Sequence, residues 1–515
     1  MKKLAVVVAG LLVLAGCSSV ETEDVSYSLG IDENAEDTRP SDDDVLVEVT
    51  PSTDEGELES VDAPIVEEEA VQEDVQVSEP RETETPLPEP SEAPTVNAPI
   101  VEDDLGYDLS YEIVDDSICK LRENSATRNS GSLQLASSFP ALKHANSLTL
   151  NGTLNVKVVF IEWENFKGTQ SDYDYHVSQL QKFASFYGMV SEGKLRFNFE
   201  FEDSWIQVGT DYNDSYIPSG MDGGDWRSTP FLQGVLDKWM LSVDPVVDFS
   251  NGDVVIFPVP RGKTVADGGA HEFPHAPGAY IQADGEKIYS WFAPGVRYMT
   301  PGQTPLWTWY SHEFGHALGI PDLRDMSDAT KNQIGVIRGE KWLVNPMGGL
   351  EVMDNEGGPT ITINAWTRWV QGWLNDDQAT CVLPENVQTE NYYRLSQLNK
   401  VGAKDKLLVI KTSATTALLI ESRRWDSKFD TPIQHSRNGV IVYRVDTTLG
   451  HEEGPLRLYS PRDITKYIYE EKTWPDHRCL DVFLYEGDKV TAQGFTIEVE
   501  KLSSSGDIVK IYKSK

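Results

Sequence analysis

The stretch WYSHEFGHALGIPDL, residues 309 to 323, predicts a helix that ends in a sharp turn. Thr304 is expected to cap this helix, with Pro305 at its first helical position, and apolar residues recur along it. Gly319 falls where a helix commonly ends in the left-handed conformation.

His312 and His316 are four residues apart, so a helix places both imidazoles on one face. Asp322 follows six residues after His316, beyond the expected turn. Two neutral imidazoles and a carboxylate give zinc three protein ligands and leave a fourth position for water, as in catalytic sites. Glu313 can act there as the general base. The pattern therefore predicts one catalytic Zn²⁺ held by His312, His316 and Asp322.

A second match to H-E-x-x-H lies in DGGAHEFPHAPG, residues 267 to 278. Pro274 stands between His271 and His275, where its ring and its missing N–H oppose a helix. The flanking glycines and prolines predict a loop. We expect a surface or packing role for these histidines, with an irregular metal site or cleft lining as the alternative.

The run HEFGHALGIPDL, residues 312 to 323, resembles the extended zinc motif of the metzincin metalloproteases, and it is most similar to the immune inhibitor A family of bacterial secreted peptidases. Further segments are similar in the same order: 186–195, 342–349, 365–374 and 439–446. The resemblance covers residues 118 to 515. It implies a metzincin-like α+β catalytic domain, with a twisted sheet and an active-site helix.

The resemblance also implies a methionine turn beneath the zinc site. Met347 has the matching Trp-x-x-x-x-Met-Gly-Gly setting, Met353 is its rival, and a plain core methionine is the alternative reading. Arg324 stands where the family commonly has tyrosine, two residues after the third ligand. This departure puts in doubt a secondary role of that tyrosine, but it does not affect the predicted zinc binding.

The remaining periodicity predicts an α+β order without a regular βαβ repeat. Expected strands and helices before residue 380 lie at 156–162, 173–191 (helix), 194–202, 229–240 (helix) and 253–259. Short β-rich runs follow at 407–411, 417–422, 439–445, 495–502 and 508–513. Three tryptophans are expected to pack in the core rather than to form a substrate platform: Trp366, Trp369 and Trp373. We therefore expect a catalytic domain at 106–378 and a β-rich C-terminal subdomain at 379–515.

The first 17 residues, MKKLAVVVAGLLVLAGC, have two lysines and an apolar run too short to span a membrane. Small residues before Cys17 resemble a bacterial lipoprotein signal, in which Cys17 is lipidated, and Ser18 resembles the outer-membrane sorting choice. An ordinary secretory signal with an incidental cysteine is the alternative. We expect a membrane-anchored lipoprotein of the bacterial outer membrane, at the cell surface or on the periplasmic face.

Residues 18–105 predict a disordered acidic linker. From residue 21 to 105 there are 29 acidic residues against two arginines, a net charge of −27, and no Phe or Trp. Such a segment cannot offset the entropy of ordering itself. We expect a tether, with an unselective acidic tail or propeptide remnant as the alternative.

Charge and cysteine content limit the partners. Residues 106 to 515 carry a net charge of −14 without a basic cluster, which disfavours nucleic acid. With Cys17 lipidated, three cysteines remain for one disulfide and one unpaired thiol. Spacing does not settle the pairing, and we take Cys119 with Cys381 as our guess. Structural Ca²⁺ stays open.

These observations predict a zinc-dependent endopeptidase that cuts proteins or peptides outside the cytoplasm and is expected to be a monomer. We prefer this hypothesis because all three ligands and the base are present. One alternative is a catalytically retired surface-binding lipoprotein on a protease scaffold. Another is a zinc hydrolase acting on something other than peptides, because the motif specifies activated water more than substrate.

Overall fold

The computed structural model describes fifteen segments of the chain: 101–102, 106–109, 115–122, 135–141, 148–212, 229–262, 278–295, 299, 304–325, 346–357, 361–387, 390–425, 428–429, 438–462 and 482–514. All belong to one compact unit, Glu92–Lys515. The expected signal with Cys17, almost all of the acidic segment and the loop His271–His275 lie outside the described residues. Within the described part, no helix has the length and apolar character needed to cross a membrane.

Regular structure begins slightly before the boundary expected at residue 105. The short strand β1 (Val101–Glu102) pairs antiparallel with β2 (Asp108–Leu109). A 3-10 helix, η1 (Asp116–Ile118), follows. The β1–β2 pair and η1 both precede the main sheet in the sequence.

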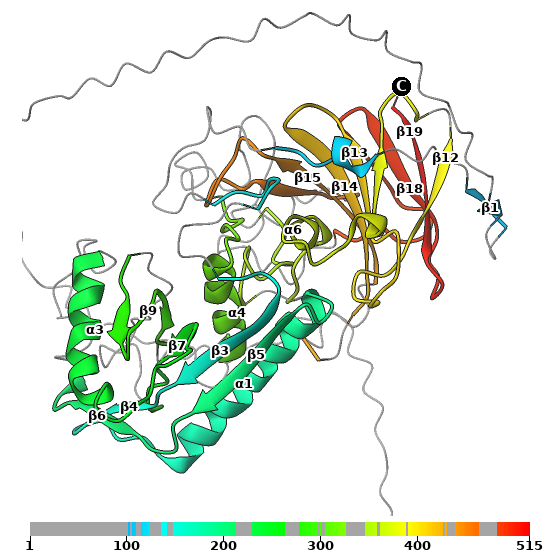
Figure 1. Ribbon diagram of the computed structural model, residues 1–515. Helices are drawn as coiled ribbons and strands as arrows, with labels where there is room; N and C mark the ends of the chain where they lie inside the picture. The colour runs from blue at the N-terminus through cyan, green and yellow to red at the C-terminus, as the bar shows by residue number, and fades with distance from the viewer. Residues whose placement is uncertain are drawn as a thin grey trace, which may run out of the picture. The chain divides into compact units, whose positions relative to one another are not determined.

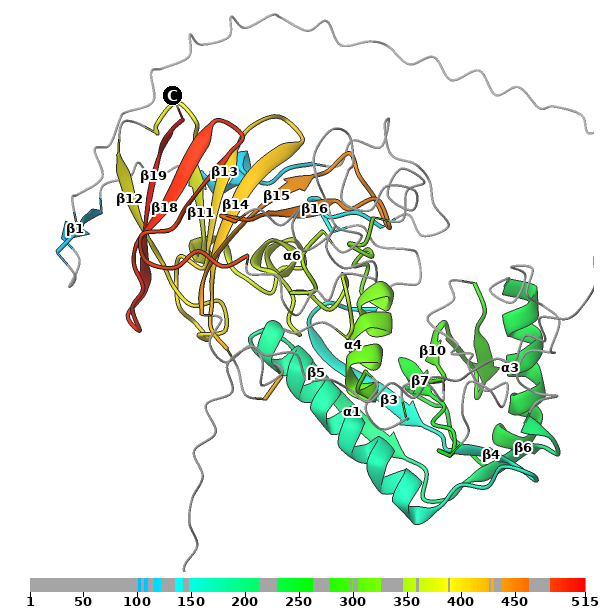
Figure 2. The same ribbon diagram turned by 180° about the vertical axis from the view of Figure 1, so that it is seen from behind.

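A four-stranded parallel sheet forms the framework of the first part, in the order β10-β7-β3-β5; β7, β3 and β5 are labelled in Figure 1, and β10 in Figure 2. Its strands are β3 (Gly152–Val158), β5 (Leu195–Phe201), β7 (Val254–Ile256) and β10 (Ser290–Phe292). Two smaller pairs accompany it: β4 (Ile161–Trp163) with β6 (Ile206–Gly209), and β8 (Ile281–Ala283) with β9 (Glu286–Ile288). The helices are α1 (Gln170–Val190), α3 (Thr229–Val243), α4 (Leu306–Ala317) and α6 (Ala365–Val370), with η4 (Asp376–Gln378) after them.

Helix α1 supports α4 from one side. Its first turn is closed by a capping box, in which Thr169 and Asp172 each accept the other's backbone N–H. Further along, the Tyr187 hydroxyl donates to the Ser311 carbonyl (2.7 Å), and the ring of Phe183 packs edge-on against Phe314. These contacts fix where α4 lies relative to the sheet.

The start of α4 differs from the sequence prediction. Pro305 is the N-cap residue in an extended conformation rather than the first helical residue, and no side chain of the cap bonds to the first turn, so Thr304 is not the cap. A residue before proline is pushed towards extended backbone, which holds Thr304 outside the helix. Gln179 of α1 caps the first turn instead, because its side-chain oxygen accepts the Trp307 N–H (3.2 Å).

Two sheets form the C-terminal part (Figure 2). The five-stranded sheet has the order β11-β13-β14-β15-β16 and the four-stranded sheet the order β12-β19-β18-β17. Their bounds are β11 (Ala379–Val382), β12 (Asn391–Leu395), β13 (Leu407–Lys411), β14 (Thr416–Arg423), β15 (Gly439–Asp446), β16 (Leu456–Tyr459), β17 (Lys489–Ala492), β18 (Phe495–Lys501) and β19 (Asp507–Lys513).

The five-stranded sheet is buried on both faces, which explains its unbroken apolar runs. Alternate residues of a strand point to opposite faces. Leu408 and Ile410 of β13 belong to a core shared with the four-stranded sheet, whereas Leu407 and Val409 belong to the core that contains α4. The described residues on either side of 378 therefore share one core, and the division expected there stays a prediction. The mixture of helix and sheet is that of an α+β fold.

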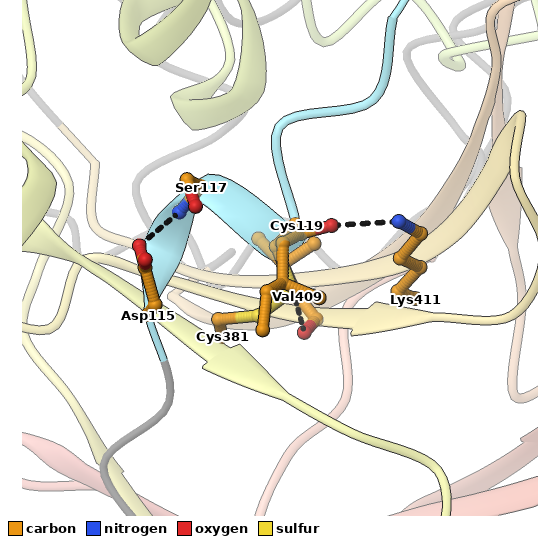
Figure 3. The surroundings of a disulfide bond; sticks show 7 residues. Asp115, Ser117, Cys119, Cys381, Val409 and Lys411 are labelled. Atoms are coloured by element: carbon orange, nitrogen blue, oxygen red, sulfur yellow. Dashed lines mark hydrogen bonds between the residues drawn. A yellow bond between two sulfur atoms is a disulfide. The ribbon is translucent and has the colours of Figure 1, made fainter. Parts of the chain in front are cut away.

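A disulfide joins Cys119 to Cys381, the two cysteines paired in the sequence analysis (Figure 3). It connects the segment after η1 to β11, across 262 residues of chain. Beside it, Lys411 Nζ donates to the Ile118 carbonyl (2.8 Å). A bond that closes so long a loop restricts the unfolded chain strongly.

The three tryptophans of 366–373 pack in the core, as predicted. Each is at most 2% exposed. The indole N–H of Trp366 donates to the Ser137 carbonyl, and that of Trp373 to the Leu150 carbonyl. Their hydrogen-bonding needs are met inside the protein, which fits packing rather than substrate contact.

Candidate metal centre

Helix α4 presents one accessible residue. Of its 12 residues, Glu313 alone is not buried. His312 and His316 are 3% and 7% exposed, and they lie one turn apart with ring centroids 5.0 Å from each other. The helix thus holds two imidazoles in the interior and one carboxylate at its edge.

The turn after α4 returns Asp322 to these histidines. Leu318 ends the helix and Gly319 follows with φ +92°, a conformation that a glycine adopts without steric cost. The Ile320 N–H then donates to the Gly315 carbonyl (2.9 Å), which closes the turn. As a result His312 Nε2 lies 3.1 Å from one Asp322 carboxylate oxygen, and His316 Nε2 lies 3.7 Å from the other.

Backbone contacts fix the tautomers of the two helix histidines. His312 Nδ1 lies 2.8 Å from the Val352 carbonyl oxygen and His316 Nδ1 lies 2.9 Å from that of Ile320. A carbonyl only accepts, so each Nδ1 carries a proton and donates. The metal-facing Nε2 is then the atom that can offer a lone pair, as in most histidine metal sites.

The donor set fits a divalent metal. His312, His316 and Asp322 are all buried and their ligand atoms lie within 4.8 Å of one another. Ligand atoms about 2.0 to 2.1 Å from a tetrahedral zinc are about 3.3 Å apart, between the two separations found here. The cluster can therefore bind a metal ion with small adjustments of side chains.

The charges within the cluster are strongly coupled. Burial alone would raise the pKa of Asp322, but His312 and His316 outweigh it and hold that pKa well below the usual range. Burial opposes charge on His312 too, yet the Asp322 carboxylate raises the pKa of His312 to about 10. Burial lowers the pKa of His316 to about 3. A metal that binds must displace the proton shared by His312 and Asp322.

Arg324, which stands where the resembled family commonly has tyrosine, lies beside the cluster. Its Nη2 lies 3.2 and 3.3 Å from the two oxygens of Asp322 and 3.4 Å from His312 Nε2. Half-buried Glu356 acts electrostatically on both Arg324 and His312, and spacing did not single it out. The centre is therefore more highly charged than the motif alone implies.

The loop between β15 and β16, residues 447–455, closes over the turn that carries Asp322. The Glu452 N–H donates to the Asp322 carbonyl and the Gly454 N–H to the Arg324 carbonyl, both at 3.1 Å. His451 Nδ1 accepts the Asp322 N–H (3.1 Å), and its Nε2 lies 3.7 Å from the Asp322 carboxylate. Nothing in the local sequence pointed to His451, because it joins the site from 129 residues away.

A buried ion pair anchors this loop to the ligand turn. Arg457 Nη2 lies 2.6 Å from Asp325 Oδ2, and the two side chains are 1% and 2% exposed. Arg457 also donates to the Gly454 and Glu453 carbonyls. Through Arg457 of β16, the five-stranded sheet thus helps to position the turn that carries Asp322.

Met353 packs against α4. Its sulfur would lie only 2.5 Å from a Cβ added to Gly315, and its carbonyl accepts the Leu323 N–H (2.9 Å). Met347 is buried as well, but the resemblance that selected it rested on sequence setting rather than on contact. Both methionines are therefore core residues, and the assignment of the methionine turn to Met347 stays a prediction with Met353 as its rival.

Gly315→Ala is expected to lower the free energy of unfolding by about 1 to 2 kcal/mol, because the added methyl must displace the buried Met353 sulfur. Gly234→Ala in α3 is the matched control, since its Cβ would meet nothing within 4 Å. That substitution should raise stability by about 0.5 to 1 kcal/mol. Urea unfolding measures both, and equal effects would contradict the packing argument.

Comparison with known proteins leaves the chain without an assigned family. No family model matches it, and no curated protein matches it. Among solved structures, wild-type OgpA from Akkermansia muciniphila matches with a TM-score of 0.26 and 13% identity, over 62% of this chain and 94% of that chain. A TM-score this low does not establish a shared fold.

Proposed function

We propose that the protein is a zinc-dependent endopeptidase of the metzincin type, similar to the immune inhibitor A peptidases. The observation that carries the proposal is the arrangement on α4. Two buried histidines converge with Asp322, and Glu313 between them is the only residue of the helix that is not buried. A carboxylate beside a metal cluster and within reach of solvent is suited to act as a general base.

His312, His316 and Asp322 would hold the zinc ion. When bound, zinc acts as a Lewis acid that acidifies water and polarises the carbonyl of the substrate. Glu313 accepts a proton from the water that adds to the carbonyl carbon, and it passes that proton to the amine nitrogen as the C–N bond breaks. The products are a carboxylic acid and an amine, so one water is consumed for each peptide bond.

Cleavage of casein tests this function. The purified full-length protein, supplied with Zn²⁺, should cleave casein, lose that activity with 1,10-phenanthroline, and regain it when Zn²⁺ is restored. Peptide products identified by mass spectrometry would show internal cuts. A zinc-loaded protein that cleaves neither casein nor gelatin would contradict the proposal.

One contact favours a second candidate function, a surface-binding lipoprotein on a retired protease scaffold. The Arg324 guanidinium lies against Asp322 and His312, and its positive charge would balance the carboxylate without a metal. Retention of His312, His316, Asp322 and Glu313 favours the enzyme. The two candidates differ in whether zinc or Arg324 is the partner of Asp322.

Arg324→Gln is expected to tighten zinc binding about tenfold, because a guanidinium near the ligands repels a divalent cation. The zinc dissociation constant can be measured by competition with a chromophoric chelator. Exposed Arg196→Gln on β5 is the control and should leave it unchanged. Weaker zinc binding in Arg324→Gln would show that the arginine supports the site.

We further propose that the enzyme acts on protein or peptide substrates as an anchored monomer outside the cytoplasm. This rests on the lipoprotein-like sequence ending at Cys17 and on the acidic segment after it. Cys17→Ser should move the protein from the membrane fraction to the soluble fraction. Unchanged fractionation would contradict lipid anchoring through Cys17.

A further inference from the structure

His451 differs from the other two histidines of the centre in its tautomer. Its Nδ1 accepts the backbone N–H of Asp322 at 3.1 Å, so Nδ1 uses its lone pair and carries no proton. In the neutral ring the proton must then be on Nε2. His312 and His316 are the opposite, because their Nδ1 atoms donate to carbonyls.

This tautomer decides what His451 can do. A metal ligand needs a lone pair, and Nε2 of His451 has a proton instead. That Nε2 lies 3.7 Å from the Asp322 carboxylate, too far for a hydrogen bond, and the His451 ring is 5.4 Å from the ring of His316. The side chain is 14% exposed. His451 thus directs an N–H towards the centre from a position that a ligand can reach.

The surrounding loop holds this donor in place. Glu452 and Gly454, which follow His451 in the loop, donate their backbone N–H groups to the carbonyls of Asp322 and Arg324. Arg457 anchors the same loop through its buried ion pair with Asp325. A donor fixed before the substrate arrives needs no reorganisation during the reaction, which is the condition under which such donors are most effective.

We propose that His451 donates its Nε2–H to the oxygen of the scissile carbonyl as negative charge develops there. This inference rests on the proposed peptidase function and adds a residue to it. The proton stays on His451 throughout, so the balance of the hydrolysis is unchanged. His451 would be a hydrogen-bond donor to the substrate and not a fourth metal ligand.

Two substitutions separate this role from a structural one. In His451→Asn, the amide oxygen can take the place of Nδ1 and accept the Asp322 N–H, but no donor reaches the position of Nε2. In His451→Gln, the amide N–H can take the place of the Nε2 donor while the contact with Asp322 N–H is lost. The substrate donor and the backbone contact are therefore removed one at a time.

For casein cleavage we expect kcat of His451→Asn to fall about 100-fold, the loss typical of removing one such donor, with KM within about threefold. His451→Gln should stay within about tenfold of the wild-type kcat. A reversed order, with the asparagine variant the more active, would overturn the proposal and leave His451 a structural residue.

Zinc content and inhibitor binding give readouts that do not depend on turnover. Both variants should retain one zinc per chain, and acetohydroxamate, titrated by calorimetry, should bind His451→Asn about tenfold more weakly than His451→Gln. Loss of zinc from both variants would identify His451 as a ligand and overturn the proposal. An inactive wild type that binds zinc would instead refute the peptidase function, and with it a role for His451 in peptide hydrolysis.

Discussion

Glu313→Gln is expected to lower kcat for casein by about 10³-fold while the protein retains one zinc per chain. The glutamine keeps the size of the side chain but cannot accept a proton, and a positioned general base contributes roughly 10² to 10⁴ in rate. Glu313 is outside the cluster of ligand atoms, so metal binding should survive its replacement. Activity assays and metal analysis on the same preparation measure both quantities.

Glu356→Gln is the matched control for this experiment. Glu356 is also a half-buried carboxylate that acts electrostatically on His312 and Arg324, but it does not belong to α4. We expect the kcat of Glu356→Gln to fall by less than about tenfold. Glu356 contributes to the electrostatic potential at the site, but it does not take part in the proton transfer. If Glu356→Gln were the more damaging of the two, the base would have been assigned to the wrong carboxylate.

Arg457→Met is expected to lower the free energy of unfolding by about 3 to 5 kcal/mol, because it leaves the buried Asp325 carboxylate without its cation. The same change should weaken zinc binding, since the loop that contacts Asp322 loses its anchor. Urea unfolding of the zinc-free protein separates the first effect from the second.

Two controls define what is lost in Arg457→Met. The double variant Asp325→Leu with Arg457→Met removes both charges and should recover much of the stability. Lys404→Met breaks an ion pair with Asp377 whose side chains are 72% and 57% exposed, and it should change stability by less than about 1 kcal/mol. Equal losses in Lys404→Met and Arg457→Met would rule out burial as the cause.

The candidate ligands could be predicted from sequence because their spacing is local. A helix at 306–317 and a glycine in the left-handed region at 319 determine where His312, His316 and Asp322 meet. His451 and Arg457 could not be predicted in the same way. They reach the turn at 322–325 only because β15 and β16 pack on the core that contains α4, which is a consequence of tertiary structure.

Strand prediction succeeded where one apolar run pairs as a single strand, and it failed where the pairing divides a run. The runs at 407–411 and 439–445 correspond to β13 and β15, but the run at 156–162 is divided between β3 and β4. At the division, the Val159 and Ile161 N–H groups donate to the carbonyls of Ile256 and Pro258. The residues of a strand do not by themselves determine which other strand it pairs with.

The cap of α4 shows the same limit. A threonine before a proline satisfied the local rule for a helix start, yet the free N–H of Trp307 is bonded by Gln179 from α1. The cap was supplied by another helix, which no local pattern contains. Local rules found the helix and the candidate ligands, and tertiary contacts determined the residues around them.

Zinc content of the purified full-length protein tests the central claim most directly. By mass spectrometry of the metal, we predict one zinc per chain in the wild type and in His275→Ala, the variant in the other H-E-x-x-H sequence, and less than a tenth of that in His316→Ala. Equal zinc in His316→Ala and the wild type, or no zinc in the wild type, would contradict a metal centre at His312, His316 and Asp322.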